Sequence, residues 1–138
     1  MFEKILVAVD GSNQARKAVD VANNLAERYH SSVCLLHAYP KIADYIGSPA
    51  FEDMIEIRTM DGQELLQSMI HHMHTSVPVE TQLLEGPPAS AILEVAETEG
   101  FDLIIMGSRG HNPVVSLLMG SVSREVSQKA HCPVMVVH

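Results

Sequence analysis

Short continuous runs of apolar residues alternate along this chain with longer segments in which apolar residues recur every three or four positions. The short runs have the length of strands and no polar alternation, which is typical of strands buried on both faces of a sheet. The longer segments have the periodicity of amphipathic helices. The pattern predicts five strands, at residues 5–9, 33–38, 77–84, 103–106 and 134–137.

Four helices are predicted between these strands: one around residues 15–29, one at about 51–74, one between Pro87-Pro88 and Gly100, and one near 117–130. Ser12 is available to cap the first helix, and Gly100 to end the third. Gly62 weakens the second helix by up to about 1 kcal/mol and indicates a bend. Residues 39–48 contain Pro, Gly and Asp without a clear period, so we expect a loop there.

Strands that alternate with helices and are apolar throughout indicate a parallel sheet that is covered on both faces. The composition is globular, since 46% of the residues are hydrophobic and 19% are charged. A length of 138 residues is that of one ordinary domain. The sequence therefore predicts a single doubly wound, Rossmann-like α/β domain over residues 1–138, with a five-stranded parallel sheet.

The charge and the apolar runs exclude several classes of protein. Nine basic and 17 acidic residues give a formal net charge of −8, without any cluster of three Lys or Arg residues, so we expect no nucleic-acid partner. The longest apolar run, Ile5–Val9, is far shorter than the roughly 18 residues of a membrane span, and we expect neither a membrane segment nor a secretory signal. Cys34 and Cys132 have no CxxC spacing, which fits a reduced cytoplasm.

Polar and glycine residues follow three of the predicted strands. Doubly wound sheets bind their ligands at the carboxyl ends of the strands, where the strand order reverses. The sequence there reads Asp10-Gly11-Ser12, His37-Ala38-Tyr39 and Gly107-Ser108-Arg109-Gly110. The last of these begins a longer pattern, in which two residues separate Gly107 from Gly110 and nine more precede Gly120-Ser121.

This glycine pattern predicts a phosphate site made largely of backbone groups. Glycines allow a positive φ and let main-chain N–H groups approach an anion closely. Gly120 to Ser123 would begin the last helix, where free N–H groups favour negative charge. The hydroxyls of Ser121 and Ser123 can donate to phosphate oxygens, and Arg109 can add a charged contact. The same glycines also fit an ordinary strand-to-helix turn and a helix cap, and this alternative stays open.

These strand ends, together with the segment from Pro133 to Val137, resemble the universal stress protein family, and the glycine pattern resembles its ATP-binding branch. The resemblance covers essentially the whole chain. It implies a cytoplasmic homodimer with a five-stranded parallel sheet and an ATP site where the strand order reverses. AMP or ADP is the alternative nucleotide, and Mg²⁺ or Mn²⁺ would accompany the phosphates.

The resemblance also implies a role for individual residues. Ala8, Val9 and Ala38 would lie around the adenine, Ala38 through its backbone, and Asp10 near the ribose or a divalent metal. The residues around the phosphates would be Met106, Gly107, Arg109, Gly110, Gly120, Ser121, Val122 and Ser123. Pro113 lies between the glycines, where it fixes φ and removes a donor, but it leaves their spacing intact.

Some candidate residues have a purely structural interpretation as well. Asp10 fits a turn or a helix cap as readily as a ligand. We interpret His37 as a core histidine and assign it no role. His71 and His74 lie three residues apart near a helix end, which is a spacing that can hold a metal. No carboxylate or cysteine accompanies them in the sequence, so we predict no metal site there.

The sequence lacks the signatures of three related classes of protein. A receiver domain needs clustered acids at the first and third strand ends, a dinucleotide dehydrogenase needs GxGxxG after the first strand, and a P-loop NTPase needs a Gly-Lys dipeptide. The resemblance to the universal stress protein family then implies a nucleotide-binding stress or signalling module that acts through an unidentified protein partner. The alternatives are a slow ATP hydrolase and a dimeric interaction protein without nucleotide. We expect a homodimer because the strand at Val134–Val137 is an apolar edge that needs cover.

Overall fold

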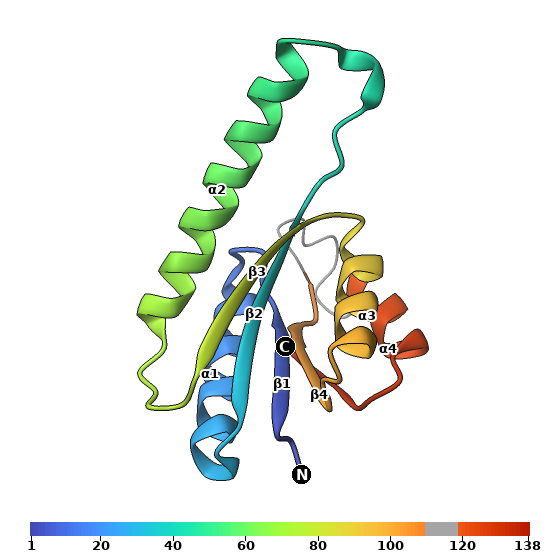
Figure 1. Ribbon diagram of the computed structural model, residues 1–138. Coiled ribbons are helices and arrows are strands. Elements are labelled where there is room, and N and C mark those ends of the chain that lie inside the picture. Colours follow the sequence, from blue (N-terminus) through green and yellow to red (C-terminus); the bar gives the residue numbers. More distant parts are fainter. Residues whose placement is uncertain (110–118) are drawn as a thin grey trace.

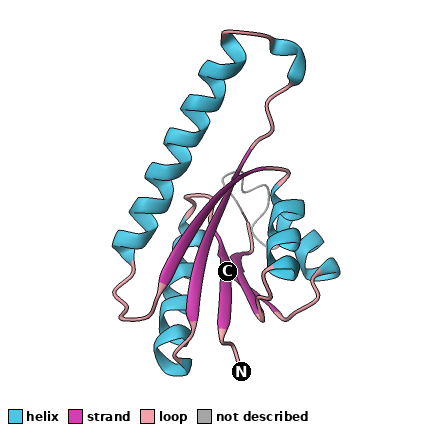
Figure 2. Cartoon of the chain, in the orientation of Figure 1, coloured by secondary structure: helices cyan, strands magenta, loops and turns pink. Residues whose placement is uncertain are grey.

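The computed structural model describes residues 1–109 and 119–138, which form a parallel sheet between two layers of helices (Figures 1 and 2). In chain order the elements are β1 (Lys4–Ala8), α1 (Asn13–Tyr29), β2 (Ser32–Tyr39), the short 3₁₀ helix η1 (Asp44–Ile46), α2 (Ala50–His72), β3 (Val79–Glu85), α3 (Pro88–Thr98), β4 (Leu103–Gly107), α4 (Ser121–Lys129) and β5 (Val134–Val137). The predicted fold class is confirmed.

The five strands are all parallel and have the order β3-β2-β1-β4-β5. The chain goes outward from β1 through β2 to β3, and then returns to the other side of β1 with β4. The strand order therefore reverses between β1 and β4, whose register places Ala8 beside Met106. A crevice forms at the carboxyl ends of two strands whose connections leave in opposite directions.

Each face of the sheet has its own apolar core. Helices α1 and α2 cover one face, where Val7, Val19 and Met69 are buried together, and α3 and α4 cover the other, with Leu6, Ile92 and Val126 (Figure 1). Successive residues of a strand point to opposite faces, so the continuous apolar run of β1 supplies both cores. Ile5, Leu6 and Val7 are fully buried.

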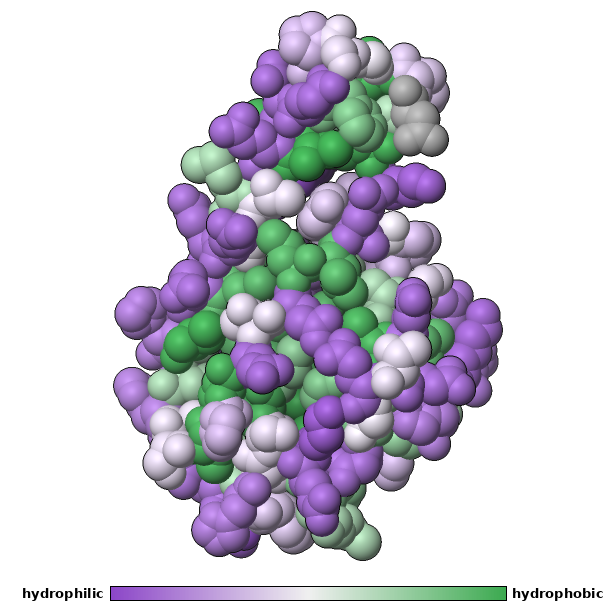
Figure 3. Space-filling view, viewed as in Figure 1, coloured by the Kyte–Doolittle hydropathy of each residue, from purple (hydrophilic) through white to green (hydrophobic). Residues whose placement is uncertain are grey.

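Helix α2 extends beyond the sheet, so only its carboxyl-terminal half packs on the strands (Figure 1). Leu66, Met69 and Met73 belong to the core, whereas Ile57 and Met60 are exposed. The space-filling view shows apolar side chains among polar ones on this projecting part (Figure 3). The carboxyl-terminal part of α2 therefore contributes side chains to the core, whereas Ile57 and Met60 of its projecting part do not.

Three local predictions need correction. Gly62 does not interrupt α2: a Cβ there would overlap Leu83 of β3, so the glycine allows the helix to pack closely against the strand. The segment after β2, predicted as a loop, contains the 3₁₀ helix η1. The last helix begins at Ser121 rather than near 117, because Met119 and Gly120 lie outside it. The caps at Ser12 and Gly100 are confirmed, Gly100 with a positive φ of 72°.

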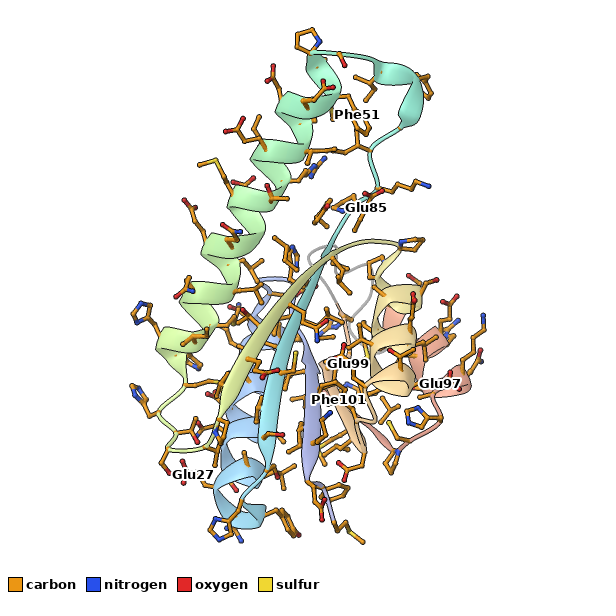
Figure 4. All side chains as sticks on the ribbon, viewed as in Figure 1. Glu27, Phe51, Glu85, Glu97, Glu99 and Phe101 are labelled. Carbon is orange, nitrogen blue, oxygen red and sulfur yellow. The ribbon has the colours of Figure 1, made fainter. Side chains whose placement is uncertain are left out.

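The amino ends of the strands are closed by contacts within the chain. The carboxylate of Asp102 accepts hydrogen bonds from the backbone N–H groups of Glu3 and Lys4, at 2.8 and 3.1 Å. The Lys4 ammonium lies 4.7 Å from the centre of the Phe101 ring, which follows the end of α3 (Figure 4). These contacts leave the carboxyl ends of β1 and β4 as the open side of the switch point. None of the described helices is long and apolar enough to cross a membrane.

Candidate functional site

A cavity of about 520 Å³ lies at the carboxyl ends of β1 and β4. Its volume is within the range of small-molecule and cofactor sites. Its walls come from the ends of three strands and from the starts of three helices. The lining residues are Ala8, Val9, Asp10, Ser12, Ala15, Leu36, Ala38, Pro88, Ile92, Met106, Gly107, Ser108, Arg109, Met119, Gly120, Ser121, Val122, Ser123 and Arg124.

The structure brings the predicted site residues together around this one cavity. All of them except Gly110 are among the lining residues, although they come from four separate parts of the chain. Gly110 and the segment 111–118 lie outside the described residues. The fold thus joins Asp10, Ala38 and the two glycine segments, as the switch-point rule led us to expect.

Eight of the lining residues are not predicted from the sequence: Ser12, Ala15, Leu36, Pro88, Ile92, Ser108, Met119 and Arg124. Ser108 and Met119 lie inside or beside the glycine pattern and were passed over as spacers. Arg124 follows the Gly-Ser-Val-Ser segment directly, so the helical spacing could have found it. Pro88 and Ile92 come from α3, and no local signal in the sequence tells which helix closes the cavity.

Part of the cavity lining is apolar. Val9, Leu36, Ile92 and Met106 are among the lining residues, and at most 5% of each is exposed. The Nδ1 atom of His37 lies 2.8 Å from the carbonyl oxygen of Val9, and it ties the end of β2 to the end of β1. His37 is thus a half-buried histidine that is hydrogen-bonded between strands, and it is not among the lining residues.

The polar end of the cavity is formed by the start of α4. Gly120 is the N-cap residue, and no side chain caps this helix. The first bond within the helix runs from the N–H of Arg124 to the carbonyl of Gly120, at 3.1 Å. The N–H groups of the three residues before Arg124 therefore have no helical acceptor, as at any helix start. They concentrate partial positive charge at this end of the cavity.

Ser108 connects the segments that build this end. Its carbonyl oxygen accepts hydrogen bonds from the Gly120 N–H, at 2.6 Å, and from the Ser123 hydroxyl, at 3.0 Å. Its own N–H donates to the carbonyl of Val137 in β5, at 2.8 Å. These bonds hold β4, β5 and the start of α4 in a fixed relation. The Ser108 hydroxyl is buried and has no partner among the described residues.

The role predicted for the Ser123 hydroxyl is not what the structure shows. This residue is only 2% exposed, and its hydroxyl lies 3.0 Å from the carbonyl oxygens of both Ser108 and Gly120. A hydroxyl has one proton, and here it is directed to the backbone rather than into the cavity. Ser121, in contrast, is exposed, so its hydroxyl remains available to a ligand.

The two described glycines of the pattern are needed for close packing rather than for unusual backbone angles. Gly120 has φ −66°, which any residue can adopt, and Gly107 is not among the glycines with a positive φ. A Cβ on Gly107 would lie 2.7 Å from the Cβ of Gln14, at the start of α1. Glycine therefore lets the end of β4 approach α1, which corrects the expected reason for this residue.

Asp10 is both a turn residue and a lining residue. Its Oδ1 atom accepts a hydrogen bond from the N–H of Ser12, at 3.0 Å, and its side chain is the only acidic one among the lining residues described. Two cations, Arg109 and Arg124, line the same cavity. The local balance is therefore positive, in a chain whose net charge is −8.

No group of three or more His, Cys, Asp or Glu side chains that could hold a metal by itself occurs in residues 1–109 and 119–138. His72, which lies between His71 and His74, instead contacts Asp20 of α1, at 2.7 Å. Magnesium ions commonly use one or two carboxylates together with substrate phosphates and water. Asp10 could be the one carboxylate of such a site. The described residues do not offer a set of side chains that could hold a metal without phosphates.

The two cysteines lie outside the cavity and are both free. Cys34 packs in the core beneath α3. Burial raises the pKa of its thiol to about 11, and the carboxylates of Glu99 and Glu80 add to this effect. Cys34 therefore stays protonated at neutral pH, which makes it a packing residue rather than a nucleophile.

Comparison with known proteins agrees with this architecture. The model of the universal stress protein family matches residues 1–138. A universal stress protein of Thermus aquaticus is 41% identical over 138 residues, which are 99% of each chain. The universal stress protein UspA of Lactobacillus plantarum has a TM-score of 0.85 at 23% identity, over 99% of this chain and 98% of that one. A universal stress protein family protein of Arabidopsis thaliana with AMP bound has a TM-score of 0.70 at 25% identity, over 97% and 90%.

Proposed function

Because this chain belongs to the universal stress protein family, we propose that it is an ATP-binding module whose nucleotide occupancy changes its contacts with a protein partner. One observation carries the proposal: one cavity is lined by buried apolar residues, by an uncapped helix start and by two arginines. An adenine ring matches the apolar lining, and phosphates match the helix start and the arginines.

The proposed pose follows the residues around the cavity. The adenine lies against Ala8 and Val9 and bonds to the backbone of Ala38. The ribose lies near Asp10. The residues around the phosphates are Met106, Gly107, Arg109, Gly110, Gly120, Ser121, Val122 and Ser123. The Arabidopsis relative with AMP bound supports an adenine nucleotide as the ligand, and the cations Arg109 and Arg124 favour one with several phosphates.

In this pose a divalent cation, Mg²⁺ or Mn²⁺, would be held by the phosphates and by the carboxylate of Asp10. The cation would neutralise phosphate charge. Because Oδ1 of Asp10 already accepts a hydrogen bond from the Ser12 N–H, the other carboxylate oxygen would contact the cation. Chelation is therefore expected to weaken ATP binding more than AMP binding, since a single phosphate needs less neutralisation.

A binding role is favoured over efficient catalysis. Fast phosphoryl transfer to water needs a base or a water-positioning group together with strong charge neutralisation. Asp10 is the only carboxylate among the described lining residues, and its expected partner is the ribose or the metal. We therefore expect ATP turnover well below about 1 s⁻¹, the low end of ordinary enzyme rates. Faster turnover in purified protein would favour the hydrolase instead.

We further propose that the chain forms a homodimer through β5, whose four residues are all half-buried in the single chain. Ile104 and Ser108 donate to the carbonyls of Pro133 and Val137, so strand alternation directs the backbone of Val134 and Val136 to the open edge. Val136→Pro removes one outward N–H while keeping the bonds to β4. We expect this variant to be a monomer by light scattering, and Val136→Ala to remain a dimer. A monomeric parent chain would refute the proposal.

The decisive experiment identifies the nucleotide directly. Purified protein is denatured and the released small molecules are measured by mass spectrometry, while calorimetry on stripped protein measures the affinities for ATP, ADP and AMP. We expect ATP to be released and to bind most tightly. Protein that carries no adenine nucleotide and binds none would overturn the proposed function. These measurements also separate ATP from AMP as the cellular ligand.

A further inference from the structure

We propose that Arg124 is a second phosphate-binding cation, which makes the cavity prefer nucleotides with a longer phosphate chain over nucleoside monophosphates. This inference rests on the proposed nucleotide site and concerns its selectivity. Arg124 lies one residue beyond the Gly120–Ser123 segment that begins α4, and its side chain lines the cavity.

The position of Arg124 is fixed by the helix. Its backbone N–H makes the first bond of α4, to the carbonyl of Gly120 at 3.1 Å. Gly120 in turn is held by Ser108. The side chain thus leaves from an ordered first turn, while Arg109 reaches the same cavity from the end of β4. Two guanidinium groups from different segments can contact an anion from two sides.

Arg124 has no acidic residue three or four positions away on its own helix, where an ion pair could form. The residues three and four positions away are Gly120, Ser121, Ser127 and Gln128, and none of them is charged. Glu125, the adjacent acid, lies 3.9 Å from Lys129 instead. Within the part of the chain that the structure describes, no ion pair or side-chain hydrogen bond engages Arg124. Its charge is therefore available to a ligand.

The helix itself does not favour a cation at this place. The start of a helix carries partial positive charge, so acidic residues stabilise a first turn and basic residues destabilise it. Helix α2 follows the rule with Glu52 and Asp53, whereas α4, like α1 and α3, has no acid in its first turn, and Arg124 comes directly after Ser123. A bound polyanion would remove this repulsion by supplying the missing negative charge.

Selectivity for longer phosphate chains follows because backbone N–H groups and arginine side chains would bind different phosphates. The free N–H groups at the start of α4 can satisfy the oxygens of one phosphate without any charged side chain. Each additional phosphate brings further negative charge into a protein of net charge −8. Since Arg109 is half-buried and Arg124 is exposed, the proposal assigns the outer phosphates to Arg124.

The test compares ATP and AMP binding by calorimetry at equal magnesium and fixed salt. Arg124→Ala is expected to weaken ATP by about 5- to 10-fold and AMP by less than about twofold, as for one exposed charged contact. Arg124→Lys is expected to recover part of the ATP affinity because it keeps the charge. Arg16→Ala is the matched control: Arg16 occupies the same place in the first turn of α1, is exposed, and lies outside the cavity lining.

The outcomes are separable. Equal losses for ATP and AMP in Arg124→Ala, or no loss for ATP, would overturn the role of Arg124 and leave the nucleotide site itself intact. If Arg16→Ala weakened ATP binding as much as Arg124→Ala, the loss would come from the change in net charge alone. This outcome would also overturn the proposal. A parent protein that binds neither nucleotide would remove the proposed function, and this inference with it. Melting curves of all three variants establish that each is folded.

Discussion

Three helices begin beside the same cavity, and two of them, α1 and α4, differ in how the N–H groups of the first turn are satisfied. At the start of α1, the hydroxyl of Ser12 accepts from the N–H of Ala15, at 3.1 Å. The carboxylate of Asp10 accepts from the N–H of Ser12. At the start of α4, Gly120 offers no side chain, and the Ser123 hydroxyl is directed to carbonyl oxygens.

The difference separates a structural helix start from one that is available to a ligand. A capped start gains roughly 1 kcal/mol of stability from its own side chain. An uncapped start forgoes that gain and keeps its donors free for an anion. The chain has both kinds at one edge of the sheet, so α1 serves as an internal reference for α4. The following variants are ordered from the largest expected effect to the smallest.

Gly120→Asp should convert the start of α4 into a self-capped one. The φ of −66° suits any residue, and the new Cβ would lie 3.2 Å from the Ser108 carbonyl oxygen, which requires only a small shift. The carboxylate would cap the helix and repel phosphate, so we expect ATP affinity to fall by about 100-fold or more with no loss of thermal stability. Gly120→Ala adds the same Cβ without charge and should cost much less affinity. Similar losses in both variants would implicate the Cβ rather than the cap.

Gly107→Ala should disturb the contact that holds the two helix starts at their present distance. Its Cβ would lie 2.7 Å from the Cβ and 3.1 Å from the backbone carbon of Gln14. We expect the free energy of unfolding to fall by about 1–3 kcal/mol, as for other overpacked sites. Urea denaturation measures this value. An unchanged midpoint would mean that α1 moves away without cost and that the glycine is not needed for packing.

Ser12→Ala should open the start of α1 and so make the two helices more alike. Loss of the cap is expected to lower the free energy of unfolding by about 1 kcal/mol. ATP affinity should change far less than in Gly120→Asp, because the hydroxyl of Ser12 is engaged by α1 itself. Denaturant titration and calorimetry on the same sample compare the two effects. A large loss of affinity with unchanged stability would reverse the roles that we assign to these helix starts.

Ser121→Ala should give the smallest effect. Ser121 lines the cavity and is exposed, so its hydroxyl can bind a ligand and is not needed for packing. We expect ATP affinity to fall by about two- to fivefold, the value of one neutral hydrogen bond, with an unchanged melting temperature. Ser123→Ala provides the contrast, since its hydroxyl holds the Ser108 carbonyl and its loss should lower stability. Identical behaviour of the two serines would contradict this distinction.

The parts of the fold that could be predicted from sequence are those encoded by local patterns. The runs of β1 and β4 are apolar throughout because both faces of these central strands are covered. The same two runs also indicate where the ligand site lies, because each is followed by polar and glycine residues at the carboxyl end of its strand. The start of α4 was placed too early because apolar residues before Gly120 continue the helical period.

The parts of the site that could not be predicted depend on packing between distant segments. Ile92 enters the cavity because α3 lies against β2 and α4, and no short-range pattern specifies that contact. The reason for Gly107 is the approach of Gln14, which only the folded chain reveals. The hydroxyl of Ser123 looks like a ligand donor in the sequence, yet its proton is used by the backbone. Arg124 was overlooked because it lies just outside the glycine pattern.

The open start of α4 has a consequence for how such a site can be detected. Its donors are main-chain amides, which remain in place when any side chain is shortened. A systematic alanine scan would therefore register most of the cavity as neutral, and would report the arginines and the packing residues instead. Amide observables, such as ¹⁵N chemical shifts or hydrogen exchange of residues 121–123, address these donors directly. The amide of Ala15 in the first turn of α1, which already has the Ser12 hydroxyl as its acceptor, provides the unresponsive signal in the same spectrum.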